Sequence, residues 1–291
     1  MSYNIDQFSK ITGINKLLLR TWENRYNFLT PQRTNTKIRI YSDELLIQGL
    51  NAKILLENGY KISVISKKNN KEIEKLITSL NEKNTDFYND YLINQFIKSA
   101  LKYNTTLFNE TFDECISKFS IILFYKKIML PTFSKVGLFW LSNKINPAQE
   151  HFLSEMFKQK IYSQIDSITK NPKKNTWLLF LPPNEHHEIG LLFSRFVLLY
   201  HSYNVIYLGS NVPLSSLSQV AQTKRIDNIL FFSVSNFSKK NLDLTISSLN
   251  KDFKKSNVYV ASKIDFDKSN KLIDKINLVK DVDNFIKIIS K

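Results

Sequence analysis

The chain has 291 residues, of which 43% are apolar, enough for two or three compact domains with their own cores. A formal net charge of +15 favours polyanionic partners such as nucleic acid. Cys115 is the only cysteine, which excludes intramolecular disulfides and thiolate-rich zinc sites and indicates a reducing compartment. Neither a signal peptide nor a membrane-spanning run is evident, so we expect a cytoplasmic protein without membrane contact.

Residues 1–75 are predicted to form a helix-turn-helix with a wing. Short helices are expected over 4–10, 15–26, 43–58 and 61–68, with Gly13 in the turn between the first two. The intervening FLTPQRTNTKIRIY combines turn residues with an alternating pattern, which predicts a β-hairpin. Between Asn15 and Tyr41, six basic residues stand against the single acid Glu23. This suits a major groove and its flanking phosphates, although such charges also occur on solvated helical surfaces.

Two further domains are expected behind this segment. Residues 85–168 carry apolar side chains at helical spacing, which predicts a four-helix bundle. Over 175–291, the short apolar runs TWLLFLP, VIYLGS, NILFFSV, NVYVAS and INLV alternate with segments of helix length. This alternation predicts a parallel α/β sheet with helices on both faces. The stretch from Lys170 to Lys174 is interpreted as a linker.

One histidine of interest follows a predicted helix start. Asn146, Pro147 and Gln149 give the pattern of an N-cap, a first-turn proline and a capping-box glutamine. Glu150 and His151 then fall near the first turn, where the helix dipole disfavours the imidazolium. A neutral imidazole is the form that binds a metal, although this context alone fits an ordinary surface histidine better.

A second histidine, His187, follows the first predicted strand of the sheet, just before a helix expected to begin near Glu188. Open α/β sheets bind ligands at the carboxyl ends of their strands, so this position favours a ligand role. Glu185 is placed to accept a hydrogen bond from the far ring nitrogen and hold the tautomer. His186 and His201 are interpreted as surface residues.

The stretch LRTWENRYNFLTPQRTNTKIRIYSDE, followed by LLENGYKISVI, resembles the MerR family of transcriptional regulators over residues 3 to about 66. The resemblance implies a winged helix-turn-helix that binds double-stranded DNA. It implies DNA contacts by Arg20, Arg25, Tyr26, Arg33, Arg39 and Tyr41, with Lys16 and Lys37 on phosphates. Trp22 is expected to pack in the core instead.

Members of that family usually bind pseudo-palindromic sites as dimers. The long helix expected to dimerise is missing here, and a polar stretch from Lys67 to Asn84 takes its place. We call the predicted winged helix-turn-helix of residues 1–75 the DNA reader. We therefore expect the region that follows it to assemble a homo-oligomer, either a dimer or a tetramer.

The bundle and sheet, over about residues 85–265, resemble a cobalamin-binding module with a four-helix cap and a flavodoxin-like, doubly wound domain. Glu185-x-His187-x-x-Gly190 matches a signature whose histidine becomes the lower ligand of cobalt. Ser233, after the third strand, also fits the family pattern, which Ser233-Val234-Ser235 follows in part. The usual Gly-Gly after the fourth strand is replaced by Ala261-Ser262, whose side chains would narrow the slot for the nucleotide tail.

The cap carries a second match. Trp140, nine intervening residues, and then Glu150 and His151 match the pattern of cobalamin-dependent MerR-type photoreceptor regulators. The resemblance implies that these residues surround the upper ligand and that His151 can take the upper cobalt position once the organic ligand is lost.

The leading interpretation is a non-enzymatic transcription regulator whose oligomerisation and DNA affinity are controlled by cobalamin. By resemblance, adenosylcobalamin is the favoured form and light the trigger. One alternative keeps the DNA reader and makes the C-terminal part a cofactor-free platform for oligomerisation or docking, which Ala261-Ser262 favours. The other alternative is a corrinoid enzyme, and the predicted DNA-binding domain argues against it.

Overall fold

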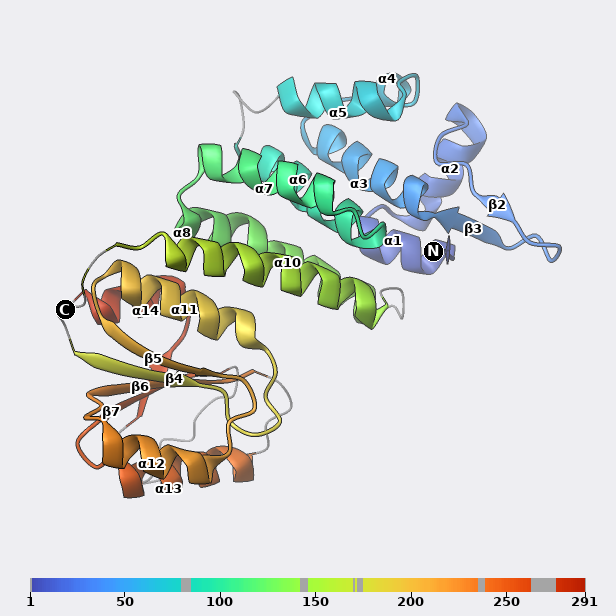
Figure 1. The fold of residues 1–291 in the computed structure, drawn as a ribbon. Helices are drawn as coiled ribbons and strands as arrows, with labels where there is room; N and C mark the ends of the chain where they lie inside the picture. The colour runs from blue at the N-terminus through green and yellow to red at the C-terminus, as the bar shows by residue number, and fades with distance from the viewer. Residues whose placement is uncertain are drawn as a thin grey trace. The chain divides into compact units, whose positions relative to one another are not determined.

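The computed structural model describes residues 2–79, 85–141, 146–169, 171, 175–234, 239–262 and 276–290. The chain forms two compact units, residues 1–153 and residues 154–291 (Figure 1). The division falls within helix α10 (Pro147–Asp166). The three domain ranges expected from the sequence, 1–75, 85–168 and 175–291, stay predictions. Within the described ranges, no helix combines the length and apolar character needed to cross a bilayer.

The first unit begins with the predicted helix-turn-helix, α1 (Ile5–Thr12) and α2 (Lys16–Tyr26). Asn4 caps α1 through a capping box, and Asn15 caps α2 by accepting from the Leu17 amide. Gly13 ends α1 at φ 68°, a left-handed conformation that glycine adopts without strain. The tight turn expected at Gly13 is therefore confirmed.

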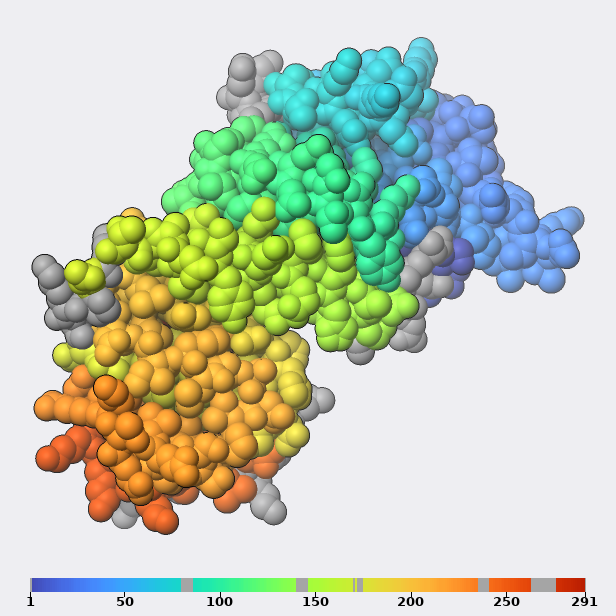
Figure 2. Space-filling view, viewed as in Figure 1, coloured from blue at the N-terminus to red at the C-terminus, as the bar shows by residue number. Residues whose placement is uncertain are grey.

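The predicted hairpin is also confirmed. Its strands are β2 (Gln32–Arg33) and β3 (Arg39–Ser42), and β1 (Ser2–Tyr3) pairs with the other edge of β3. Both pairings are antiparallel, in the order β1-β3-β2. The tip of the hairpin stands out from the remainder of the first unit (Figures 1 and 2).

The segment behind the wing is more helical than the sequence analysis expected. It contains α3 (Asp43–Glu57), α4 (Ile62–Ile65) and α5 (Asn70–Ser79). The interpretation of Lys67–Asn84 as a polar stretch is wrong for α5. Ile73 and Ile77, one helical turn apart, are both buried, so α5 presents an apolar stripe to its neighbours α3 and α6.

The four-helix bundle is confirmed among the described residues. Its helices are α6 (Thr85–Leu101), α7 (Thr105–Lys118), the adjoining segments α8 (Ile121–Phe124), η1 (Tyr125–Met129) and α9 (Leu130–Leu141), and finally α10. The η1 segment is a π-helical turn within the third helix. Phe96, Phe108, Phe112 and Phe124 fill the core with edge-to-face ring contacts at centroid distances of 5.0–6.1 Å.

The second unit contains a five-stranded parallel sheet in the order β5-β4-β6-β7-β8. The strands are β4 (Thr176–Phe180), β5 (Asn204–Gly209), β6 (Asn228–Ser233), β7 (Asn257–Ser262) and β8 (Ile276–Val279). The helices are α11 (Glu188–Tyr200), α12 (Leu214–Thr223), α13 (Lys239–Asp252) and α14 (Val282–Ile289). All five predicted strands are present, and their order is that of flavodoxin-like folds.

Helices cover both faces of this sheet, as predicted (Figure 1). On one face, Phe180 and Phe231 from neighbouring strands pack with Leu217 of α12 and Leu249 of α13. On the other, Trp177 of β4 meets the ring of Phe285 in α14. The chain reverses strand order at β4, which lies between β5 and β6, so ligands are expected beyond the carboxyl ends of β4 and β6.

Candidate functional site

The basic residues predicted to bind DNA lie on the surface of the first unit. Arg20, Arg25 and Lys37 are exposed, and so is Lys16, which forms an ion pair with Asp6. An exposed pair of this kind contributes little stability, so phosphate can replace Asp6 as the partner of Lys16 at small cost. Tyr26 is half-buried at the end of α2, with the Arg25 guanidinium 5.8 Å from its ring centre.

Glu23 fastens the wing to the second helix. It accepts from the Arg33 Nη2 at 2.5 Å and from the Arg39 Nε at 2.6 Å, one arginine on each strand of the hairpin. Burial acts to raise the pKa of Glu23, but the hydrogen bonds from Arg39 and Arg33 outweigh it and hold this pKa below its ordinary value. The sequence analysis noted this acid as the exception in a basic stretch, and the structure gives it a positioning role.

One predicted DNA contact is wrong. Tyr41 is fully buried, and its ring stacks on Phe8 with centroids 4.2 Å apart. Among the described residues its hydroxyl has no hydrogen-bond partner. Every second residue of a strand faces inward, and position 41 of β3 lies on that side. The aromatic ring therefore belongs to the core of the reader, as does Trp22, which was predicted to pack and is buried.

In the second unit, the loop after β4 holds His187 by means of a buried carboxylate. Glu185 is fully buried, and its Oε1 accepts from the backbone amides of His186 and His187 at 2.9 and 3.0 Å. The same oxygen lies 2.7 Å from the Nδ1 of His187. The contact predicted between Glu185 and the imidazole ring of His187 is therefore present, and it is made by Nδ1. Because Nδ1 faces the carboxylate, the Nε2 edge lies on the side away from it, and the side chain is 64% exposed.

Glu185 also connects this loop to the neighbouring strand. Its Oε2 accepts from the Val234 amide at 2.9 Å, immediately after β6. Ser233, the last residue of β6, is buried, and within the described part of the chain its hydroxyl has no hydrogen-bond partner. A buried hydroxyl without a partner is costly, and a ligand atom at this point would satisfy it.

The first turn of α11 is anchored by a second acid. Glu188 accepts from the Tyr207 hydroxyl of β5 at 2.9 Å and pairs with Lys158 of α10 at 3.3 Å. Burial and the neighbouring Glu188 raise the pKa of Tyr207 well above its ordinary value, so this tyrosine stays a donor. These contacts fix the backbone from which the side chain of His187 projects.

Helix α11 and strand β6 lie very close together at Gly190. A Cβ built on Gly190 would lie 2.6 Å from the ring of Phe232, so α11 and β6 approach closely because residue 190 is glycine. Ala261 and Ser262, where the resemblance implied two glycines, form the end of β7 and are half-buried. Side chains therefore stand where the tail of a cobalamin nucleotide was expected.

The predicted cap residues lie on two helices. Trp140 is in α9, and its side chain lies outside what the structure describes. Asn146 accepts from the Ala148 amide, and its own amide donates to Gln149 at 3.1 Å, so the predicted start of α10 is confirmed. In the first turns that follow, Glu150 is half-buried and His151 is exposed.

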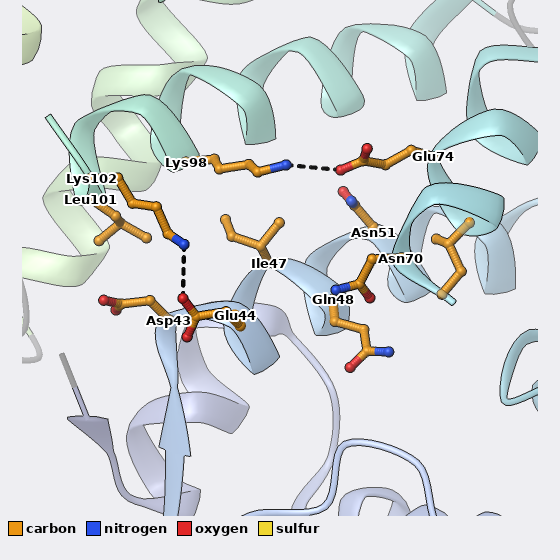
Figure 3. Close-up of a pocket in the computed structure, with 11 residues that line it drawn as sticks. Asp43, Glu44, Ile47, Gln48, Asn51, Asn70, Glu74, Lys98, Leu101 and Lys102 are labelled. Atoms are coloured by element: carbon orange, nitrogen blue, oxygen red, sulfur yellow. Dashed lines mark hydrogen bonds and ion pairs between the residues drawn. The ribbon is translucent and has the colours of Figure 1, made fainter. Parts of the chain in front are cut away.

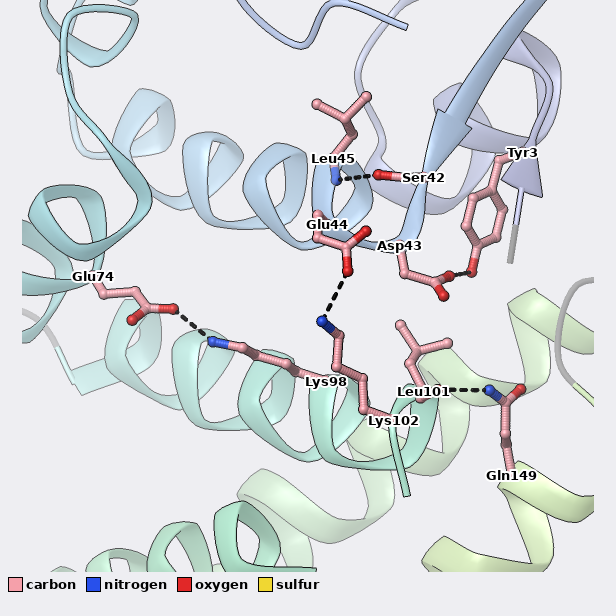
Figure 4. A network of polar contacts seen from close by, with 10 residues as sticks. All are labelled: Tyr3, Ser42, Asp43, Glu44, Leu45, Glu74, Lys98, Leu101, Lys102 and Gln149. Atoms are coloured by element: carbon pink, nitrogen blue, oxygen red, sulfur yellow. Dashed lines mark hydrogen bonds and ion pairs between the residues drawn. The ribbon is translucent and has the colours of Figure 1, made fainter. Parts of the chain in front are cut away.

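Polar contacts occur from the start of α10 to β1, the strand that pairs with β3, within the first unit (Figure 4). The buried Gln149 donates to the Leu101 carbonyl at the end of α6, 3.1 Å away. The next residue, Lys102, pairs with Glu44 of α3 at 2.8 Å. Beside Glu44, Asp43 accepts from the Tyr3 hydroxyl of β1 at 2.8 Å.

A pocket between α3, α5 and α6 borders this network (Figure 3). Lys102–Glu44 and Lys98–Glu74 cross it as ion pairs. Deeper between α3 and α6, Asn94 donates to Asn51 at 3.1 Å, and both amides are buried. The reader is thus attached to α6 by buried amides as well as by exposed charges.

A basic winged helix-turn-helix, followed by a bundle and a flavodoxin-like sheet, defines the class of the protein: a DNA-binding regulator with an appended ligand-binding fold. Residues 3–71 match the MerR HTH family regulatory protein family, and residues 92–163 match the B12 binding domain family. The chain combines these two modules, and it is homologous to the transcriptional repressors CarH and CarA.

The two relatives are from Myxococcus xanthus. The HTH-type transcriptional repressor CarH is 24% identical over 252 residues, which cover 85% of this chain and 84% of CarH. The HTH-type transcriptional repressor CarA is 24% identical over 78% of this chain and 75% of its own length. A monomethylamine corrinoid protein from Methanosarcina barkeri shares the fold, with a TM-score of 0.57 at 14% identity over 69% of this chain and 98% of that protein.

The sequence analysis missed part of the outward face of α2. Leu17, Thr21 and Asn24 share this face with Arg20, at the helical spacing i, i+3, i+4 and i+7. Leu19 and Trp22 are buried on the opposite side. Counting the helical spacing from Trp22 would have found these residues, but attention to charge alone did not.

Proposed function

We propose that this chain is a transcription regulator whose binding to DNA is controlled by cobalamin held at the loop after β4. One observation carries the proposal: a fully buried Glu185 fixes an exposed His187 at the carboxyl end of β4, next to a buried Ser233 hydroxyl. A carboxylate that orients a histidine through one ring nitrogen is the usual support for a metal-binding imidazole. The homology to two repressors and the match to a B12 binding domain support the same function.

The residues of the loop fit a corrinoid cobalt. His187 would be the lower ligand, supported by Glu185, and the Ser233 hydroxyl would bond to the tail of the cofactor. In the cap, His151 is proposed as an upper ligand, with Trp140 and Glu150 beside the upper face. When bound, adenosylcobalamin supplies a cobalt–carbon bond that light can break.

On the DNA side, α2 is proposed to enter the major groove while the wing reaches phosphates. The proposed contacts are Lys16, Arg20, Arg25, Tyr26, Arg33, Lys37 and Arg39, and the buried Tyr41 is excluded. Glu23 engages Arg33 and Arg39 through one nitrogen each. Since a guanidinium has five N–H donors, both arginines keep donors for phosphate.

Regulation is proposed to pass through the contacts between α10, α6 and α3. The Gln149–Leu101 hydrogen bond joins the helix of His151 to the end of α6, and Asn51–Asn94 joins α6 to the reader. The exposed Lys102–Glu44 pair adds little energy, so the buried amides carry most of the coupling. Two readers held in a homo-oligomer would then bind repeated sites with higher avidity.

The test is reconstitution of the purified chain with adenosylcobalamin in the dark, read by the cobalamin absorbance that stays with the protein. We expect uptake by the natural chain, loss of uptake in His187→Ala, and normal uptake in the matched control His186→Ala. Size-exclusion and DNA-binding measurements before and after illumination then test the switch. Identical elution volume and DNA affinity in dark and light would contradict light control, and equal uptake by all three proteins would contradict the site.

A second candidate function is a cofactor-free regulator whose sheet domain serves only for assembly. The pair Ala261-Ser262, in place of the two glycines that the resemblance implies, favours it because two side chains would narrow the slot for the nucleotide tail. Cobinamide, which lacks the nucleotide tail, separates the two. If the chain takes up neither cobalamin nor cobinamide, the cofactor-free regulator is supported. If it takes up both, the cobalamin sensor is supported. Replacement of Ala261 and Ser262 by glycine is expected to raise uptake of cobalamin but not of cobinamide if the slot is used.

A further inference from the structure

A large apolar side chain lies on the outward face of α2, the proposed recognition helix. Leu17 is 71% exposed in the first turn of this helix, and Leu18 beside it is 47% exposed. Single exposed leucines are common on protein surfaces and need no explanation by themselves. Leu17 differs from such leucines in its position on the proposed recognition helix and in the side chains that share its face, and both indicate a binding role.

The two leucines differ in their surroundings. Leu18 borders an apolar hollow formed by the turn after α1 and by α3 and α4, so it partly covers the core of the reader. Leu17 does not line that hollow. Leu18 therefore has a packing role in this structure, whereas the exposure of Leu17 has no such explanation.

Leu17 shares its face of α2 with Arg20, Thr21 and Asn24. Arg20 and Asn24 are exposed, and Thr21 is half-buried. The Thr21 hydroxyl donates to the Leu17 carbonyl at 2.9 Å, which commits the hydroxyl to the helix and leaves the methyl as the group that can meet a partner. This face thus offers an isobutyl group, a methyl, a guanidinium and an amide over two helical turns.

These groups match the chemistry of base edges in the major groove. Apolar side chains contact the thymine methyl, asparagine pairs with adenine, and arginine pairs with guanine. The N-terminal part of a recognition helix is the part that contacts bases. From residue 17 to residue 24 the helix rises about 10 Å, the length of about three base pairs.

Charge around the face argues for DNA as the occupant rather than a second protein surface. Lys16 precedes Leu17, Arg25 follows Asn24, and Arg33 of the wing is joined to α2 through Glu23. A second copy of the same basic surface would be repelled. Phosphates on both sides of a groove would pair with these cations while the face itself meets the bases.

We infer that Leu17 and Thr21 read thymine methyl groups, so that the operator half-site contains thymines at the steps facing the start of α2. This inference rests on the proposed DNA-binding function and adds the base preference of the site. Asn24 and Arg20, which lie on the same face of α2, contact further base edges of the half-site.

The experiment starts by selecting binding sites from a random duplex library with the full-length chain. Each thymine of the selected site is then replaced by deoxyuridine, which pairs identically but lacks the methyl group. For the natural chain we expect one or two positions where the replacement weakens binding about fourfold each, the effect of losing one buried methyl contact. Leu17→Ala should bind the thymine duplex more weakly and lose the discrimination at one of these positions.

Leu18→Ala is the matched control, because it removes the same group from the neighbouring position, and it should keep the thymine preference. Equal binding of thymine and deoxyuridine duplexes by the natural chain overturns the inference and leaves DNA binding intact. A change of elution volume in Leu17→Ala without a change in thymine preference also overturns it, in favour of a protein interface. If the library yields no enriched site, the proposed function itself fails.

Discussion

The DNA reader and the loop after β4 present their functional side chains in different ways. In the reader, each exposed cation stands on a helix or hairpin that is fixed by many apolar contacts, such as the stacking of Phe8 on Tyr41. In the loop, the exposed His187 depends on one buried residue, Glu185, which receives three backbone amides and lies against the imidazole. Stability is distributed in the first region and concentrated in the second. Single substitutions should therefore have unequal effects.

The largest effect is expected for Glu185→Ala. Three part-buried backbone amides would lose their acceptor, and each lost hydrogen bond costs about 1 kcal/mol or more because the acceptor is charged. We expect the free energy of unfolding to fall by about 3 kcal/mol or more in urea titrations, together with loss of cobalamin uptake. His187→Ala removes only the ring contact, so it should lose uptake while it remains close to natural stability. An unchanged urea midpoint in Glu185→Ala would show that the loop does not depend on this carboxylate.

An intermediate effect is expected for Gln149→Leu, which tests the proposed coupling through the contact of α10 with α6. The change removes a buried hydrogen bond to the Leu101 carbonyl and the cap on the Asn146 amide, at a cost of about 1–3 kcal/mol. The ratio of DNA affinities with and without cobalamin should also move toward one. Gln159→Leu, on an exposed position of the same helix, is the control. If both variants keep the natural ratio, coupling takes another route.

A smaller effect, and a pH dependence, is expected at Glu44. The hydrogen bond from Lys102 lowers the pKa of Glu44 from its ordinary 4.5 to about 2. Because the folded pKa is lowered, the pair stabilises the fold above about pH 4.5 and loses its contribution as the pH falls toward 2. The side chain is largely exposed, so Glu44→Gln should cost no more than about 0.5 kcal/mol at pH 7.

Urea unfolding of the natural chain and of Glu44→Gln at pH 7, 4.5 and 2 measures this difference. The gap between the two proteins should close on going from pH 4.5 to pH 2. Glu57→Gln is a suitable control, because its pair with Lys53 lies within α3 and does not join the reader to α6. A gap that persists at pH 2 would contradict the assignment to the carboxylate.

The smallest effect is expected for Tyr41→Phe. The hydroxyl is buried and has no hydrogen-bond partner among the residues that the structure describes, so its removal costs nothing. The free energy of unfolding should be unchanged or higher by up to about 1 kcal/mol, with unchanged DNA affinity. By contrast, Arg20→Ala should weaken DNA binding without loss of stability. Weaker DNA binding by Tyr41→Phe would instead support the DNA contact that the sequence analysis predicted for Tyr41.

Most of the fold follows from periodic patterns in the sequence. The five strands, the four-helix bundle and the caps at Asn4, Asn15 and Asn146 all depend on local spacing, which a single sequence displays directly. Helix α5 was missed because only Ile73 and Ile77 face inward on it, and its other positions are polar enough to hide the stripe.

The candidate sites were less predictable, because burial decides the role of a residue and depends on the tertiary structure. Tyr41 and Arg39 both lie in the motif that resembles the MerR family, yet β3 turns one into the core and leaves the other near the surface. The contact between Glu185 and His187 could be predicted because it is local. The hydrogen bond from the Val234 amide to Glu185 could not, because it joins segments far apart in the sequence. The crowding of Gly190 by Phe232 likewise has no local signal.

The π-helical turn at Tyr125–Met129 marks the place in the third helix of the bundle where a change of one residue in length disturbs the packing least. A π-helical turn contains about one residue more than an α-helical turn. Deleting one residue there would leave an ordinary α-helical turn and keep the directions of the side chains over Leu130–Leu141, whereas a deletion in a regular α-helical part would rotate the following residues by about 100° around the helix axis. When homologous chains are aligned, a one-residue gap is therefore expected at this turn, and the separation of Trp140 from Glu150, which both follow it, is unaffected.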